Sequence, residues 1–155
     1  MPYRPYATTE VDRNYAYKVA WAGAGCSVIS LALYLLGIDG IVNAWVFGGT
    51  VGGLLAATFN RRVDDYYLSL CSTGERWVMV ALGLYMIVGW FVWTADIASP
   101  AGLGFLAPDA AAPSGLAPSV LIDGMLVAHV LAVVFYAGYT FRWLRDRVDA
   151  SDGDL

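Results

Sequence analysis

The residue best suited to chemistry in this sequence is its single histidine, His129, which lies in an uncharged stretch from residue 124 to residue 141. An imidazole can bind a haem iron or a pigment magnesium, contact a quinone or carry a proton. An ionisable group in the middle of an apolar helix is costly to leave unpaired, which makes it a functional candidate. His129 is therefore a candidate cofactor contact, with a (bacterio)chlorophyll, a haem or a quinone as the candidate ligand.

The alternative for His129 is a neutral histidine fixed between helices by one hydrogen bond. Such a bond stabilises membrane helix packing by about 1 kcal/mol. Four polar residues at a similar depth could supply it, namely Ser27, Ser30, Thr50 and Tyr85.

The rest of the sequence offers little other chemistry. A membrane b-type haem takes two axial histidines, so one chain does not hold such a haem alone. The two cysteines, Cys26 and Cys71, lie far apart in the sequence and make no metal-binding or redox motif with the histidine. There is no G-x-S-x-G turn, phosphate loop or C-x-x-C. We predict no catalytic residues, no metal site and no enzyme activity.

Two acids near the apolar stretches are expected to be structural. Asp123 precedes His129 by six residues, about 240° around a helix, so the two do not share a face. Asp123 suits the first turn of a helix whose N-cap is Ser119. Asp96 and Asp123 could meet at the outer rim and bind a cation, but we interpret them as solvated end caps.

Four stretches free of charged residues position these groups, and each is about as long as the roughly 20 residues a helix needs to cross a bilayer. The chain is 59% apolar and 14% charged. We predict an all-α integral membrane protein of four transmembrane helices in two antiparallel hairpins. The spans are about 19–38, 41–59, 77–96 and 120–141, within a membrane domain of residues 19–145.

The basic residues set the expected topology, because Lys and Arg in short loops mark the cytoplasmic side. Four crossings place all nine on one side: Arg4, Arg13, Lys18, Arg61, Arg62, Arg76, Arg142, Arg145 and Arg147. Both termini are then cytoplasmic, with an interfacial segment at 1–18 and an acidic tail at 146–155. We place the protein in a bacterial inner membrane and expect no nucleic-acid partner, since acids accompany the basic residues.

The connecting segments have different characters. Residues 60–76 are expected to form an interfacial loop containing a short amphipathic helix, which Thr73 and Gly74 end. Residues 97–119 form the outer loop, whose four prolines disfavour a continuous helix. That loop is nevertheless apolar, so we expect the membrane surface or another subunit to cover it.

Small residues in the second span form two adjacent stripes, which predict close helix packing. One stripe is Gly48, Gly52 and Ala56, and the other is Gly49, Gly53 and Ala57. The simpler interpretation is packing against small residues of the first span. The alternative is that two stripes are too broad for one partner, so that one faces another protein, a lipid or a pigment.

These patterns favour a non-catalytic accessory subunit of a larger inner-membrane complex, respiratory or photosynthetic. Its expected partners are other integral membrane proteins and the lipid bilayer. No cofactor is certain, and lipid, quinone and (bacterio)chlorophyll are the candidates. The alternative function is a small homo-oligomeric transporter or channel, with His129, Tyr85 and Thr50 along the path.

Overall fold

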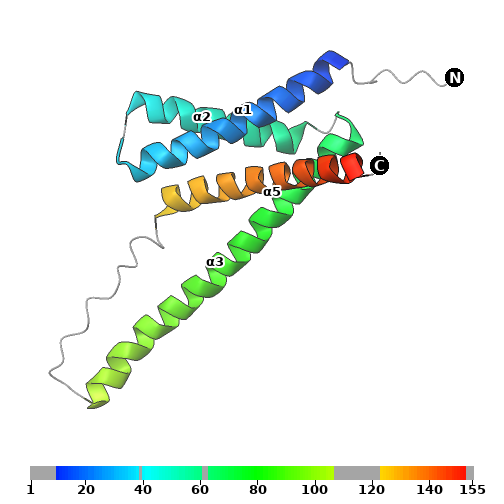
Figure 1. The fold of residues 1–155 in the computed structure, drawn as a ribbon. Coiled ribbons are helices and arrows are strands. Elements are labelled where there is room, and N and C mark those ends of the chain that lie inside the picture. The colour runs from blue at the N-terminus through cyan, green and yellow to red at the C-terminus, as the bar shows by residue number, and fades with distance from the viewer. Residues whose placement is uncertain (1–9, 39, 61–62, 107–122, 153–155) are drawn as a thin grey trace.

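The computed structural model describes residues 10–38, 40–60, 63–106 and 123–152, and this part of the chain forms four α-helices (Figure 1). They are α1 (Glu10–Leu35), α2 (Ile41–Phe59), α3 (Asp65–Leu106) and α5 (Gly124–Asp152). Within the described residues, α1, α2 and α5 are long and apolar enough to cross a membrane. The described part of the chain is therefore all-helical, with helices suited to a membrane.

A tight turn makes α1 and α2 an antiparallel hairpin. Gly37 has a φ of 67°, in the left-handed region that favours glycine. Its N–H donates to the Tyr34 carbonyl at 3.1 Å, and the Ile38 N–H donates to the Leu33 carbonyl at 3.0 Å. This is the Schellman arrangement, which satisfies the last carbonyls of a helix and stops it. It ends α1 at Leu35, before the predicted boundary at residue 38.

The helices α1 and α2 cross where glycines face one another. A Cβ added to Gly53 would lie 2.8 Å from the Cα of Gly23, and one added to Gly23 would overlap the Tyr136 hydroxyl of α5. One turn away, a Cβ at Gly49 would lie 2.9 Å from the Cys26 Sγ. Three helices therefore meet at a point that only glycine backbones leave open.

A second glycine pair makes the crossing of α3 and α5. A Cβ on Gly138 would lie 3.1 Å from the Gly74 Cα and 2.9 Å from the Trp77 ring. A Cβ on Gly74 would lie 2.7 Å from the Phe135 carbonyl oxygen. The two helices touch here at backbone distance, so α5 is held by α1 on one side and by α3 on another.

An aromatic cluster closes the bundle near the start of α1 and the start of α3. The Asp64 carboxylate accepts hydrogen bonds from the Tyr67 N–H at 2.8 Å and the Tyr17 hydroxyl at 3.1 Å, which caps α3 and ties it to α1. The rings of Tyr17 and Tyr67 meet edge to face at 5.2 Å. Tyr67 and Tyr139 are almost completely buried between the helices.

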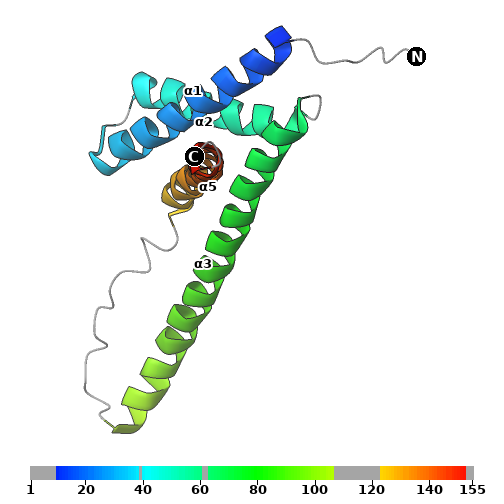
Figure 2. The same ribbon diagram turned by 45° about the vertical axis from the view of Figure 1, so that its right-hand side comes forward.

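Beyond its crossing with α5, α3 continues as an arm away from the other helices (Figures 1 and 2). Large apolar side chains are exposed over roughly half of its circumference, namely Met79, Val80, Leu84, Met86, Ile87, Val88, Trp90 and Phe91. The half-buried residues on the remaining side, among them Val78 and Leu82, are apolar as well. A helix that is apolar on all sides belongs in hydrocarbon or inside a larger protein assembly.

The course of α3 differs from the sequence prediction of a loop at 60–76, a span at 77–96 and an outer loop at 97–119. The helix runs without a break from Asp65 to Leu106. Gly74 does not end it, because that glycine is needed inside the helix for the close approach to α5. The helix also passes Pro100, and the part of the predicted outer loop from residue 107 onward lies outside the described residues.

The other boundaries compare as follows. The range of α2 is the one predicted for the second span. α5 begins at Gly124, with the Asp123 side chain accepting from the N–H groups of Met125 and Leu126 at 3.0 and 3.1 Å. Asp123 therefore takes the capping role predicted for Ser119, which lies outside the described residues. α5 also continues to Asp152, through most of the predicted tail.

The glycine crossing yields a matched pair of variants in α2. Gly53→Ala should destabilise the bundle by about 1–3 kcal/mol, because the new methyl group has no room. Gly52→Ala, where a Cβ has nothing within 4 Å, should leave stability unchanged or raise it slightly. Denaturant titration of the detergent-purified chains measures both, and equal effects would contradict the crossing.

Candidate functional site

His129 lies between α1, α2 and α5 and is 1% exposed. Tyr34 of α1 stacks on its ring with centroids 5.1 Å apart, and Phe47 of α2 lies at 4.8 Å. Two aromatic rings from two helices thus enclose the imidazole. We call His129, Ser30, which is bonded to it, and Asn43, which is bonded to Ser30, the histidine cluster.

Both nitrogens of the imidazole have partners within the chain. Nδ1 lies 2.6 Å from the Met125 carbonyl oxygen of its own helix, and Nε2 lies 2.9 Å from the Ser30 Oγ of α1. The Ser30 Oγ is in turn 3.3 Å from the side-chain oxygen position of Asn43 of α2. These contacts link three helices. Ser30 is one of the four partners predicted for His129, and it is the one that the structure places at the imidazole.

Proton counting fixes the direction of these bonds. A carbonyl only accepts, so Nδ1 must carry a proton and donate to Met125. In the neutral imidazole Nε2 then accepts the single hydroxyl proton of Ser30. That hydroxyl cannot also donate to Asn43, so the Asn43 amide must present its NH₂ group to the serine oxygen. The buried side chains of His129 and Ser30 are then both satisfied.

Asp123 lies close to the histidine cluster without bonding to His129. Its carboxylate accepts a short hydrogen bond from the Tyr34 hydroxyl, and the Tyr34 ring covers the imidazole. The predicted end-cap role of Asp123 is therefore combined with a tie between α1 and α5. The side chain of Asp96, the other predicted carboxylate of the outer rim, lies outside the described part of the chain.

The arrangement constrains any cofactor at His129. A metal centre of a haem or a (bacterio)chlorophyll binds an imidazole nitrogen lone pair, and in the neutral ring that lone pair on Nε2 accepts from Ser30. A ligand would have to displace Ser30 and part the helices around a ring that is 1% exposed. What the geometry does directly is fasten α1, α2 and α5 together. The cofactor contact remains a hypothesis.

The other predicted polar residues are bonded to their own helices. The Thr50 hydroxyl donates to the Val46 carbonyl at 3.2 Å, and the Ser27 hydroxyl donates to the Ala24 carbonyl at 2.8 Å. Both side chains are buried. Among the described residues, no three His, Cys, Asp or Glu side chains gather closely enough to hold a metal ion.

The two small-residue stripes of α2 have different surroundings. Gly49 and Gly53 pack against α1, and Ala57 is buried. Gly48 and Gly52 would meet nothing within 4 Å if a Cβ were added, and Ala56 is half-buried. We call Gly48, Gly52 and Ala56 the open stripe. Beside it lies a shallow hollow of about 510 Å³, lined by Ala44, Trp45, Gly48 and Gly49.

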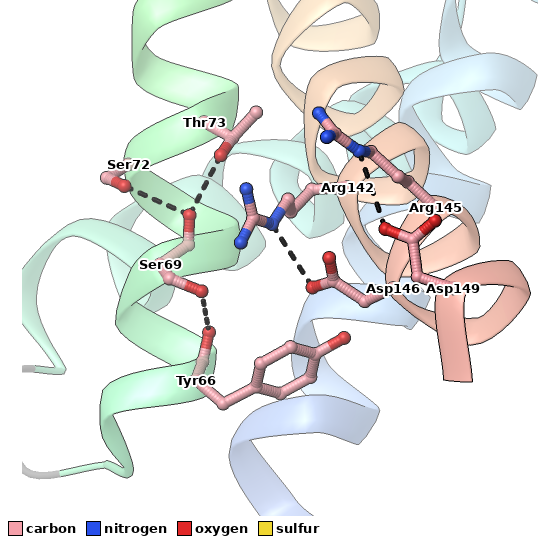
Figure 3. Close-up of polar contacts among 8 residues, drawn as sticks. All are labelled: Tyr66, Ser69, Ser72, Thr73, Arg142, Arg145, Asp146 and Asp149. Carbon is pink, nitrogen blue, oxygen red and sulfur yellow. Dashed lines mark hydrogen bonds and ion pairs between the residues drawn. The ribbon is translucent and has the colours of Figure 1, made fainter. Parts of the chain in front are cut away.

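A polar patch forms where the start of α3 meets the end of α5 (Figure 3). The pairs Arg142–Asp146 and Arg145–Asp149 lie along α5 at 3.1 and 3.7 Å. Partial desolvation and the Asp146 carboxylate raise the pKa of the Tyr66 hydroxyl above its usual range. The nearby hydroxyls of Ser69, Ser72 and Thr73 donate to backbone carbonyls of α3.

Cys71 lies in the aromatic cluster and is 3% exposed. Burial raises the pKa of its thiol to about 11, which suppresses the reactive thiolate. This agrees with a structural cysteine.

Three members of the site escaped the sequence reasoning: Tyr34, Phe47 and Asn43. Tyr34 and Phe47 read as ordinary apolar positions within their spans, and Asn43 as an outer-edge residue of little specificity. The available signal was helical spacing: Tyr34 comes one turn after Ser30, and Phe47 comes one turn after Asn43. No family model, curated protein or solved structure matches the chain.

Replacing the histidine tests its structural role. His129→Leu should lower stability by about 1–3 kcal/mol, because the buried Ser30 hydroxyl loses its acceptor. Ala128→Leu, on the exposed side of the same turn, is the matched control and should be neutral. Thermal unfolding with parallel absorption spectra reads both. Unchanged stability with loss of a visible or near-infrared band would instead identify a bound cofactor.

Thiol labelling tests the burial of Cys71 in a Cys26→Ala background. At pH 8 a thiol of pKa about 11 is about one part in a thousand thiolate, against about a quarter for an ordinary cysteine. Maleimide labelling should therefore be slow in the folded chain and fast after denaturation. Fast labelling of the folded chain would show that Cys71 is accessible.

Proposed function

We propose that the chain is a non-catalytic accessory subunit of a larger complex in a bacterial inner membrane, a respiratory or photosynthetic assembly being the setting. The observation that carries the proposal is the open stripe of α2. Its partners are other integral membrane proteins, which pack against the helix faces that this chain leaves uncovered.

The open stripe has the properties of a membrane helix interface. Gly48 and Gly52 are four residues apart, so they form one flat surface on which a second backbone can approach closely. The neighbouring stripe already packs this way inside the chain, where Gly53 meets Gly23. The same chemistry on the free side supports packing by a helix from another protein, with the hollow at Trp45 receiving a side chain.

The arm of α3 supports the same proposal. Its large apolar residues from Met79 to Phe91 are exposed over roughly half of the helix circumference, whereas the first turns of α3 are packed on α5. The arm diverges from the other helices (Figure 2). In a larger assembly, the wedge between the arm and the bundle can be filled by neighbouring subunits.

The arrangement of helix ends supports cytoplasmic termini. The start of α1, the start of α3 and the end of α5 gather at one end of the bundle (Figure 1). Their basic residues belong to the same end, including Arg13, Arg76 and Arg142. Basic residues are enriched on the cytoplasmic side of inner-membrane proteins, so we assign this end to the cytoplasm.

The alternative of a homo-oligomeric transporter or channel receives less support. Two residues assigned to its path, His129 and Thr50, are buried and bonded inside one chain. A conduction path needs polar groups that face a water-filled space. Flux into liposomes that contain this chain alone would favour the alternative.

The experiment is a mild-detergent pull-down of the tagged chain from native membranes, with mass spectrometry of the partners. Gly52→Leu should release stoichiometric partners while the chain stays folded, because the leucine blocks the open stripe. Gly25→Leu is the matched control, since a Cβ at Gly25 of α1 also meets nothing within 4 Å.

Each outcome is decisive. Partners that are retained by Gly25→Leu and lost by Gly52→Leu support both the subunit role and the α2 interface. Purification of the unmodified chain as an isolated monomer, or as a complex of identical chains only, would contradict the subunit role.

A further inference from the structure

A groove runs along α5 beside its buried face, and the core residue Tyr136 lines both. It has a volume of about 420 Å³ and is formed by α1, α3 and α5. Its walls are mainly apolar, with Ala24 and Val28 on α1, Trp77 on α3, and Val133, Ala137 and Phe141 on α5. The groove does not involve the open stripe of α2 or the histidine cluster.

The dimensions of the groove match a hydrocarbon chain. From Val133 to Leu144 the axis of α5 advances by about 16 Å, at 1.5 Å per residue. One leaflet of a bilayer has a hydrocarbon depth of about 15 Å, half of the roughly 30 Å core. Only about one turn of a helix about 10 Å wide would fit in this volume. The groove is therefore too small for a helix that runs its full length of about 16 Å.

Two arginines follow the groove at its C-terminal end. Arg145 comes one helical turn after Phe141, and Arg147 comes three residues after Leu144, so they flank the groove's line on either side. Arg147 lies over the Trp143 ring at 4.0 Å. Arg145 pairs with Asp149 at 3.7 Å, and both side chains are largely exposed, so that pair is weak.

Tryptophans mark this end as the headgroup level. Trp77 lies on the groove wall, and Trp21 meets Trp143 edge to face at 5.2 Å. Tryptophan is enriched where membrane meets water. The arginines therefore lie just outside the hydrocarbon boundary that the apolar groove reaches from within.

From this juxtaposition we propose that the groove binds an anionic phospholipid. One acyl chain lies along α5 from Val133 to Leu144, and the phosphate pairs with Arg145 and Arg147. Guanidinium groups bind phosphate through paired hydrogen bonds, and basic residues at a membrane surface attract anionic lipid. The inference requires only that the bundle is embedded in a bilayer, and it is independent of any partner at α2.

The test is lipid titration of the purified full chain followed by native mass spectrometry. Phosphatidylglycerol and phosphatidylcholine with identical acyl chains separate the headgroup from the tail. The unmodified chain should retain phosphatidylglycerol preferentially. The double change Arg145→Gln and Arg147→Gln should weaken its binding by about fivefold for each arginine removed. Arg76→Gln is the control, since residue 76 is about 200° around α3 from the α5-facing Gly74.

A second variant tests the groove without changing charge. Ala137→Phe fills the groove from its exposed floor and should reduce phosphatidylglycerol binding, with helicity and elution volume unchanged. Equal retention of both lipids by the unmodified chain would overturn the proposal. So would unaltered binding in the double arginine variant, or full binding in Ala137→Phe, which would place the lipid elsewhere on the surface.

Discussion

The structure depends on two places where helix backbones touch without side chains between them. At one of them Gly23 of α1 meets Gly53 of α2, and at the other Gly74 of α3 meets Gly138 of α5. In a bilayer, apolar side chains gain little by leaving lipid for protein, so close packing is the main source of association. Tyr136 links the first crossing to α5, because its hydroxyl occupies the space that a Cβ on Gly23 would need.

These crossings decide which polar groups are buried and which faces remain free. With α1 and α2 in contact, Ser30 is held near the His129 ring, and the imidazole becomes a fastening between helices. Because only one stripe of α2 is used in the crossing, Gly48 and Gly52 are left open. Because α3 diverges from α5 beyond their crossing, large apolar side chains from Met79 to Phe91 are left exposed. The proposed partner surfaces and the lipid groove lie on the helix faces that these internal contacts leave uncovered.

The sequence predicted the helical membrane class and the range of α2, because charge-free stretches and their lengths report burial in lipid directly. It predicted two stripes on α2 without saying which one the chain uses, since that depends on the rotation of α1. It was wrong about Gly74, which reads as a helix end when its partner Gly138, 64 residues later, is unknown. The enclosure of His129 was also hidden, because Tyr34 and Phe47 come from other helices. Long-range pairings of this kind leave no local pattern.

The most direct test of the α1–α2 crossing is a disulfide. A Cβ at position 49 would lie 3.5 Å from the Cys26 Cβ, within the range for cystine. Mild oxidation of Gly49→Cys in a Cys71→Ala background should therefore join residues 26 and 49 within one chain, as peptide mapping would show. Gly48→Cys, on the open stripe, should form no bond with Cys26 of its own chain. Failure of the first variant to link, or equal linking by the second, would contradict the crossing and the assignment of the open stripe with it.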